Sequence, residues 1–171
     1  MEKKDQTYSY GCAMVYFKFP DMFKIHNSID SKDIYTENND KSYGLENEPH
    51  VTILYGLHSD EINDQDVIRF CKEKEIGEIT LHNPSLFQNE KYDVLKFDAK
   101  NDNLVKLNKI LCKKFPYTND YPDYHPHSTI AYLKSGKGEK YVNLIKKSGG
   151  EFKVYPEKIV YSKPSGEKIT G

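Results

Sequence analysis

Hydrophobic and polar positions follow two rhythms along this chain, one typical of strands and the other typical of helices. Short runs of β-branched and aromatic residues, alternating or continuous, predict strands because such side chains pack well on a pleated surface. Each run is bounded by Pro, Gly, Asn or Asp, which favour turns. This pattern predicts strands at residues 10–19, 50–55, 78–87, 92–98, 127–133 and 152–162.

Apolar residues at helical spacing predict helices between these strands. Helices are expected at residues 22–29, 64–75, 102–115 and 141–147. The third has the clearest inner face, formed by Leu104, Leu107, Ile110 and Leu111, and such a stripe indicates core packing. Asp64 is the expected N-cap of the second helix. The order of elements predicts an α+β protein, in which the polar, turn-rich stretch 21–48 is typical of a lid or binding loop.

Length and composition predict one compact domain over residues 1–171. A chain of 171 residues with 14 Tyr and 8 Phe can bury a sizeable core. It has no apolar run long enough to span a bilayer, and its polar start, Met1 to Gln6, is unlike a signal peptide. The three cysteines are odd in number and widely spaced, which indicates reduced thiols in a cytoplasm.

The net charge of −1 hides an asymmetry between the two parts of the chain. Residues 1–103 contain 12 Lys or Arg and 20 Asp or Glu, a net charge of 12 − 20 = −8. Residues 104–171 contain 13 Lys or Arg and 6 Asp or Glu, a net charge of 13 − 6 = +7. A long nucleic-acid groove usually needs a basic domain with Arg as well as Lys, and this chain has one arginine, Arg69. The numbers favour a small anionic ligand near the basic part, although lysine-rich solvated surface gives the same count.

One polar pattern occurs twice, as His50-Val51-Thr52-Ile53 and as His127-Ser128-Thr129-Ile130. Both copies begin predicted strands, so the His and Thr of each copy point to the same face. A single His-x-Thr in a strand is usually a packing feature. Two copies with the same residues, phase and strand context favour a catalytic pair.

The chemistry that fits these four side chains is phosphodiester cleavage. Such a reaction needs a base to deprotonate the attacking hydroxyl and an acid to protonate the leaving oxygen. Histidine suits both roles because its ordinary pKa is about 6.5. The Thr52 and Thr129 hydroxyls can donate to non-bridging phosphate oxygens, whose charge grows in the transition state. No metal or cofactor is needed when a neighbouring 2′-hydroxyl is the nucleophile.

The paired motifs resemble those of the 2H phosphoesterase superfamily. A closer resemblance is to the phage anti-CBASS cyclic-oligonucleotide phosphodiesterases. It lies in the wider segments 48–57 and 121–132, in Gly136-Lys137-Gly138 and in the opening strand from Tyr10 to Phe17. The resemblance covers residues 10–163. It implies a bilobal fold in which two antiparallel sheets frame a central cleft, with helices on the outside.

The resemblance also implies an activity. The four catalytic positions are His50, Thr52, His127 and Thr129, and the substrates are cyclic di- and trinucleotides with 3′–5′ linkages. Hydrolysis is metal-independent and passes through a 2′,3′-cyclic phosphate, which destroys a messenger of bacterial anti-phage signalling. The expected partner is therefore a small cyclic oligonucleotide, with no long nucleic acid, membrane, metal or cofactor. Which histidine is the base stays open, as do base preference and oligomeric state.

Residues outside the motifs are expected to bind the substrate. Tyr16 is the aromatic residue on one face of the first strand and can stack a base, with burial in the core as the rival interpretation. Tyr124 and Phe87 border predicted strands and are weaker choices. His125 and Asp123 could suggest zinc together with His50, but Pro126 interrupts the spacing, and a shared strand face already explains the pattern.

Two other functions compete with this prediction. One is a 2H enzyme that acts on 2′,3′-cyclic phosphate ends or 2′–5′ linkages of RNA, which the scarcity of arginine disfavours. The other is a sponge that sequesters the messenger without cleaving it. Binding alone does not need two titrating groups, so the intact His and Thr pairs argue against a sponge.

Overall fold

A computed structural model describes residues 10–38, 40–120 and 123–171. Within these residues the strands form two four-stranded antiparallel sheets, in the orders β2-β1-β7-β8 and β5-β4-β3-β6. The strands of the first sheet are β1 (Tyr10–Phe17), β2 (His50–His58), β7 (Pro156–Ser162) and β8 (Lys168–Thr170). Those of the second are β3 (Ile79–Gln88), β4 (Tyr92–Lys100), β5 (His127–Lys134) and β6 (Phe152–Val154).

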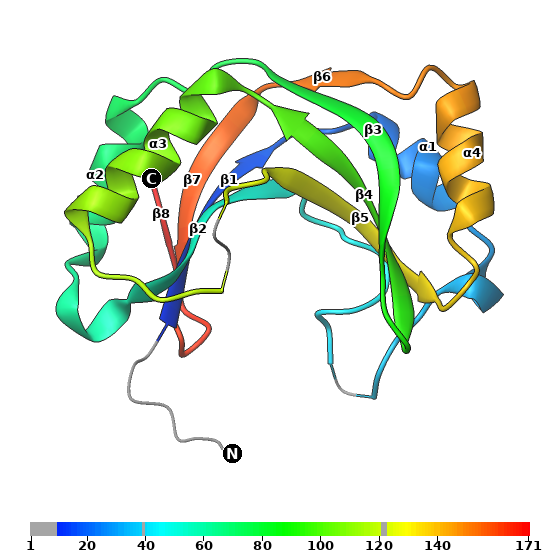
Figure 1. Ribbon diagram of the computed structural model, residues 1–171, viewed down its shortest axis with the longest axis horizontal. Helices are drawn as coiled ribbons and strands as arrows, with labels where there is room; N and C mark the ends of the chain where they lie inside the picture. The colour runs from blue at the N-terminus through cyan, green and yellow to red at the C-terminus, as the bar shows by residue number, and fades with distance from the viewer. Residues whose placement is uncertain (1–9, 39, 121–122) are drawn as a thin grey trace.

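The two sheets curve together into an arch, and the helices lie on its outside (Figure 1). The helices are α1 (Asp21–Ser28), α2 (Asp64–Glu73), α3 (Asp102–Lys114) and α4 (Glu139–Lys147), with 3₁₀ turns at Ser31–Asp33 and Ser59–Glu61. α2 and α3 cover the first sheet, and α1 and α4 cover the second (Figure 1). This arrangement confirms the predicted α+β fold with antiparallel sheets and outer helices.

Helix α3 begins and packs as its sequence predicts. The Asn101 side chain accepts a hydrogen bond from the backbone N–H of Leu104 and caps the helix, which satisfies one of the free N–H groups of the first turn. Leu104, Leu107 and Leu111 are fully buried, whereas Ile110, the fourth residue of the predicted inner face, is only partly buried. At α2 the cap is one residue earlier than expected: the Asn63 side chain, not Asp64, accepts from the N–H of Gln65.

The strand predicted at 152–162 is wrong as a single element. It is two strands that belong to different sheets, because β6 pairs with β3 whereas β7 pairs with β1. The break falls at Tyr155-Pro156, where proline has no N–H to donate to a continuous ladder. The chain crosses from one sheet to the other at this point (Figure 1). β8, which the sequence analysis did not predict, then extends the first sheet beyond β7.

The stretch between α1 and β2 is fastened to the second sheet. The N–H of Tyr35 donates to the carbonyl of Tyr132 at 2.9 Å, and the N–H of Tyr132 donates to Gly44 at 2.8 Å. The N–H of Glu46 donates to the carbonyl of Ile130 at 2.9 Å. Both arms of this loop therefore pair with one edge of β5, which covers an otherwise open sheet edge. Whether the part between these arms moves as a lid stays a prediction.

The central strands of the arch are β2 and β5, which lie next to each other. The main core lies between the sheets and the helices and is continuous through both sheets. A smaller cluster of Met14, Tyr16 and Val160 lies on the opposite, concave face of the first sheet. No helix in the described part of the chain is long and apolar enough to cross a membrane.

Candidate active site

Each predicted motif occupies the beginning of a central strand. His50 and Thr52 open β2, where they pair with Tyr16 and Met14 of β1. His127 and Thr129 open β5, and their partners are on β4. In both strands the His and Thr are half-buried and the residues between them are fully buried. The alternation of a strand thus turns both pairs away from the core, toward the concave face of the arch.

Both histidines are held in the same tautomer by the same local contact. His50 Nδ1 lies 2.8 Å from the carbonyl oxygen of Glu48, and His127 Nδ1 lies 3.0 Å from that of His125. A carbonyl oxygen only accepts, so Nδ1 must carry the proton in each ring. Nε2 is then the basic nitrogen of the neutral ring and the acidic N–H of the protonated ring. Each histidine can therefore serve as base or acid through Nε2.

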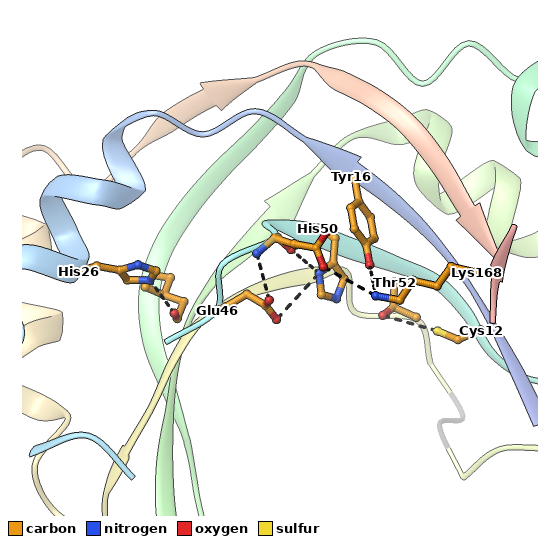
Figure 2. A network of polar contacts seen from close by, with 9 residues as sticks. Cys12, Tyr16, His26, Glu46, His50, Thr52 and Lys168 are labelled. Carbon is orange, nitrogen blue, oxygen red and sulfur yellow. Dashed lines mark hydrogen bonds and ion pairs between the residues drawn. The ribbon is translucent and has the colours of Figure 1, made fainter. Parts of the chain in front are cut away.

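The surroundings of His50 come from three strands and a loop (Figure 2). Its ring stacks on that of Tyr16, with centroids 5.2 Å apart and planes inclined by 25°. Lys168 of β8 contacts the Tyr16 hydroxyl at 3.4 Å and the Glu48 carboxylate at 3.7 Å. The Glu46 carboxylate lies 4.0 Å from His50 Nδ1. His50 therefore has a carboxylate near Nδ1, and the tyrosine on which it stacks contacts a partly exposed ammonium group.

The surroundings of His127 come from β3 and β4. Its ring meets the edge of Phe87, with centroids 5.1 Å apart and planes at 88°. The Lys96 ammonium lies 4.6 Å above the Phe87 ring and donates to Asp98 Oδ1 at 2.7 Å. Lys96 is only 8% exposed, although it is a lysine. Asn83 donates to the other oxygen of Asp98 at 2.7 Å.

Burial lowers the pKa of His127 from its ordinary value, and the charges of Lys96 and His50 lower it further. The hydrogen bond to the His125 carbonyl and the Asp98 charge act in the opposite direction. Burial alone would raise the pKa of Asp98, but hydrogen bonds from Lys96 and Asn83 hold it below its ordinary value. That the charge of His50 acts on His127 agrees with the two motif strands lying next to each other.

The two aromatic residues chosen for substrate binding have other contacts in the structure. Tyr16 is in the site, but its side chain is 6% exposed, with His50 against the ring and the Lys158 ammonium 5.4 Å from its centroid. The Tyr124 hydroxyl donates to the carbonyl of Thr52 at 2.7 Å. Phe87, the weaker choice, is 47% exposed and touches His127. Of these three rings, Phe87 offers the most surface to a base.

The turn at Gly136-Lys137-Gly138 is built around a buried carboxylate. The N–H groups of Gly136 and Gly138 donate to Asp93 Oδ2 at 3.2 and 3.0 Å, and Asp93 is 1% exposed. These amides are therefore occupied by the protein's own anion. Tyr121 and Pro122, which belong to the second resembling segment, lie outside the described residues. Among residues 10–38, 40–120 and 123–171, no group of three or more His, Cys, Asp or Glu side chains is placed to hold a metal ion.

Lys96 and Asp98 are the site residues that the sequence analysis missed. The available signal was a lysine and an aspartate two residues apart in an otherwise apolar strand, Val94-Leu95-Lys96-Phe97-Asp98. Alternation places both on the face that carries His127 and Thr129, their partners on β5. His26, for which no role was predicted, fastens α1 to β5 through a 2.9 Å contact between Nε2 and the Ile130 carbonyl (Figure 2).

Comparisons with known proteins agree with this geometry. The chain is similar to Usb1 of Kluyveromyces marxianus, at 9% identity and a TM-score of 0.56, with 95% of this chain and 97% of that chain covered. Usb1 with uridine monophosphate is similar at 10% identity and a TM-score of 0.58, with 94% and 96% covered. At these identities the likeness shows the fold. No curated protein matches the chain in sequence. A family model described as the 2′-5′ RNA ligase superfamily matches residues 21–154, which is most of the chain. The protein therefore belongs to this superfamily of 2H phosphoesterases and is a phosphodiesterase by family.

Proposed function

We propose that the protein is a metal-independent phosphodiesterase that hydrolyses the 3′–5′ linkages of cyclic di- and trinucleotide messengers. The observation that carries the proposal is the pair of matching His-x-Thr motifs on neighbouring strands, each with Nδ1 fixed on the carbonyl two residues earlier. That contact leaves both Nε2 atoms available for proton transfer. Two titrating groups and two hydroxyls are the functional groups that cleavage of an RNA-like linkage needs.

The reaction has two steps in which the histidines exchange roles. In the first, one Nε2 takes the proton of a 2′-hydroxyl, whose oxygen attacks the neighbouring phosphorus. The other Nε2 gives its proton to the departing 5′-oxygen, and a 2′,3′-cyclic phosphate forms. In the second step water attacks that phosphorus, its proton goes to the histidine that was the acid, and the other histidine protonates the ring oxygen that leaves. Thr52 and Thr129 donate to the non-bridging oxygens in both steps.

The charges around the site support a small anionic substrate. Lys96, Lys158 and Lys168 gather around the aromatic rings beside the two histidines. Glu46 and Glu48 lie beside them on the side of β2. A mixed arrangement of this kind suits a few phosphates held in one place better than a long strand, which needs a continuous basic surface. With the resemblance of both motif segments, this supports a role in removing cyclic messengers of anti-phage signalling.

A second candidate is an RNA phosphodiesterase that acts on 3′ ends. The fold likeness to Usb1, one of whose structures holds uridine monophosphate, favours it. Cleavage at a 3′ end places only one base and one phosphate near the two histidines. The exposed Phe87 ring beside His127 could stack that base. The two functions differ in whether a ring-closed substrate without ends is cleaved.

The test is a substrate panel assayed in the presence of a chelator. Cyclic dinucleotides, cyclic trinucleotides, RNA with 2′,3′-cyclic phosphate ends and RNA with free 3′ ends are each incubated with the protein. The proposal expects turnover of the cyclic oligonucleotides and a loss of about 10²–10⁴-fold in kcat for His50→Ala and for His127→Ala. Lys106→Met, which removes an exposed lysine of α3 far from the two motifs in the sequence, should retain activity.

Other outcomes of the panel contradict the proposal in different ways. Turnover of linear RNA alone would identify the second candidate. Tight binding of a cyclic oligonucleotide with no product would identify a sponge. Activity that appears only when a divalent metal is added would exclude the His/His mechanism.

A further inference from the structure

The two catalytic histidines have matching surroundings that extend beyond the motifs. Each ring packs on an aromatic ring, each aromatic ring lies near a lysine ammonium, and each ammonium contacts a carboxylate. On the first sheet these residues are Tyr16, Lys168 and Glu48 around His50. On the second they are Phe87, Lys96 and Asp98 around His127. The two motifs are therefore alike in their surroundings as well as in sequence, since each histidine has the same three kinds of side chain around it.

The two copies differ in how firmly the cation is held. The side chain of Lys96 is 10% exposed and its Nζ lies 2.7 Å from Asp98, whereas the side chain of Lys168 is 48% exposed and its Nζ lies 3.7 Å from Glu48. Only the first of these separations is a hydrogen bond. A buried charge is screened less by solvent than an exposed one, so the Lys96 ammonium is both fixed in position and weakly screened.

The carboxylates next to the two rings differ in their own partners. The Glu46 carboxylate lies 4.0 Å from Nδ1 of His50 and attracts the protonated form of that ring. His127 also has a carboxylate opposite it, because Asp98 is its partner on β4, but both oxygens of Asp98 already accept hydrogen bonds, from Lys96 and Asn83. One ring therefore has an anion at its protonated nitrogen, and the other faces an anion that is already paired with a fixed cation.

We propose that Lys96 is a positioning residue that sets the direction of catalysis, so that His127 is the general base and His50 the general acid when the 2′-hydroxyl attacks. The inference rests on the proposed function, because it assigns roles within that reaction. Lys96 acts through His127, not by contact with the reacting atoms: its ammonium group disfavours a second positive charge on the imidazole. A neutral imidazole can accept the proton of the attacking hydroxyl.

The pKa of His127 changes in the direction that this assignment requires. Burial lowers it and Lys96 lowers it further, so the ring is neutral at a pH where an ordinary histidine is partly charged. The titratable and charged groups that act on it are Lys96 and Asp98 of β4 and His50 of β2. His82 of β3, the partner of Asp98, acts in turn on that carboxylate. The groups that contact His50 or its aromatic partner are Glu46, Glu48, Lys158 and Lys168.

The deciding experiment is an NMR titration of the histidine Cε1–H signals, which does not depend on turnover. His50→Ala and His127→Ala assign the two signals. Lys96→Met should raise the pKa of His127 by about one unit, because the cation is lost and Asp98 is left to attract the imidazolium. Asp98→Asn should lower it, because Lys96 is then unopposed. Lys106→Met, which removes a lysine from the exposed side of α3, should leave it unchanged.

Opposite shifts in the two variants are a signature that a purely structural role for Lys96 does not produce. The double variant Lys96→Met/Asp98→Asn removes both charges and should give a pKa of His127 between those of the two single variants. If neither single variant shifts the signal, or if both shift it in the same direction, the proposal is overturned. A Lys96→Met protein that does not fold leaves the Asp98→Asn and double variants to decide the question.

The kinetic half of the test separates the roles. The acidic limb of the pH profile of kcat/KM reports the base, so it should move to higher pH in Lys96→Met and to lower pH in Asp98→Asn. A shift of the alkaline limb instead would make His127 the acid and overturn the assignment. If the unchanged protein cleaves no phosphodiester of the panel, the proposed function fails, and the NMR titration still shows whether Lys96 keeps His127 neutral.

Discussion

The contact between Tyr124 and Thr52 makes a prediction that distinguishes two roles for this tyrosine. Its hydroxyl donates to the Thr52 carbonyl at 2.7 Å, and its ring packs against the main core. The bond links the segment that leads into β5 with the strand that carries His50 and Thr52. Burial raises the pKa of the Tyr124 hydroxyl above its ordinary value, so it stays a donor across the whole assay range. The structure thus assigns Tyr124 to hold the two motif strands together.

Tyr124→Phe keeps the ring and removes only this bond. Leaving a buried carbonyl without its donor costs about 1–3 kcal/mol. Since 1 kcal/mol corresponds to about 2–4 °C in a protein of this size, thermal denaturation should show a Tm lower by roughly 2–12 °C. Steady-state kinetics should show a lower kcat with little change in KM, because Thr52 is held less firmly.

Base stacking by Tyr124 predicts the reverse pattern. A phenylalanine stacks as well as a tyrosine, so Tyr124→Phe would be neutral, while Tyr124→Leu would raise KM by the loss of about 1–3 kcal/mol of stacking. A Tm that stays within about 1 °C in Tyr124→Phe, together with a raised KM in Tyr124→Leu, would refute the assignment of Tyr124 as a structural link.

Other predictions concern the hydroxyls, the exposed ring and the buried turn. Thr52→Val and Thr129→Val should each lower kcat by about 10²–10³-fold, the cost of one transition-state hydrogen bond. Thr80→Val serves as the control. An unchanged kcat in both Thr52→Val and Thr129→Val would exclude contacts from these hydroxyls to the phosphate. Phe87→Leu should raise KM for cyclic dinucleotides by roughly 5–150-fold if the ring stacks a base, as measured by initial rates. Asp93→Ala should lower the midpoint of urea unfolding, since the buried N–H of Gly138 loses its acceptor at about 1–3 kcal/mol, and the partly buried N–H of Gly136 loses its acceptor as well.

Local sequence signals were sufficient for the elements that position the catalytic residues. The beginnings of β2 and β5 coincide with the predicted motif strands, and α3 has the predicted leucine face. These features depend on alternation, helical spacing and a side-chain cap, all of which act within a few residues. The same alternation placed His and Thr of each motif on one face before any tertiary contact was known.

Elements that depend on distant partners were not predictable in this way. The sequence from Phe152 to Ser162 predicts one strand. It forms two strands because β6 pairs with β3 in one sheet and β7 pairs with β1 in the other. β8 is a strand of three residues that is stabilised by β7, because so short a segment has too little pattern of its own. The pairing of the loop with β5 likewise appears only in the folded chain.

Lys96 shows why part of the site also escaped prediction. A lysine in a strand is usually solvated, and single-residue statistics give it no chemical role. Here the Phe87 ring and the Asp98 carboxylate, from two strands, enclose its ammonium group. The electrostatic effect of a charge depends on this enclosure, and enclosure is a property of the tertiary structure.

Identical motifs cannot by themselves give an acid–base pair its direction. The two His-x-Thr copies share the same letters, the same strand positions and the same Nδ1 contact, so the motifs alone would give both histidines the same proton affinity. Catalysis needs one ring neutral and the other protonated at the same pH. The difference must therefore come from residues outside the motifs. A buried lysine, paired with Asp98, packs on the ring that contacts His127, whereas the Glu46 carboxylate lies 4.0 Å from Nδ1 of His50.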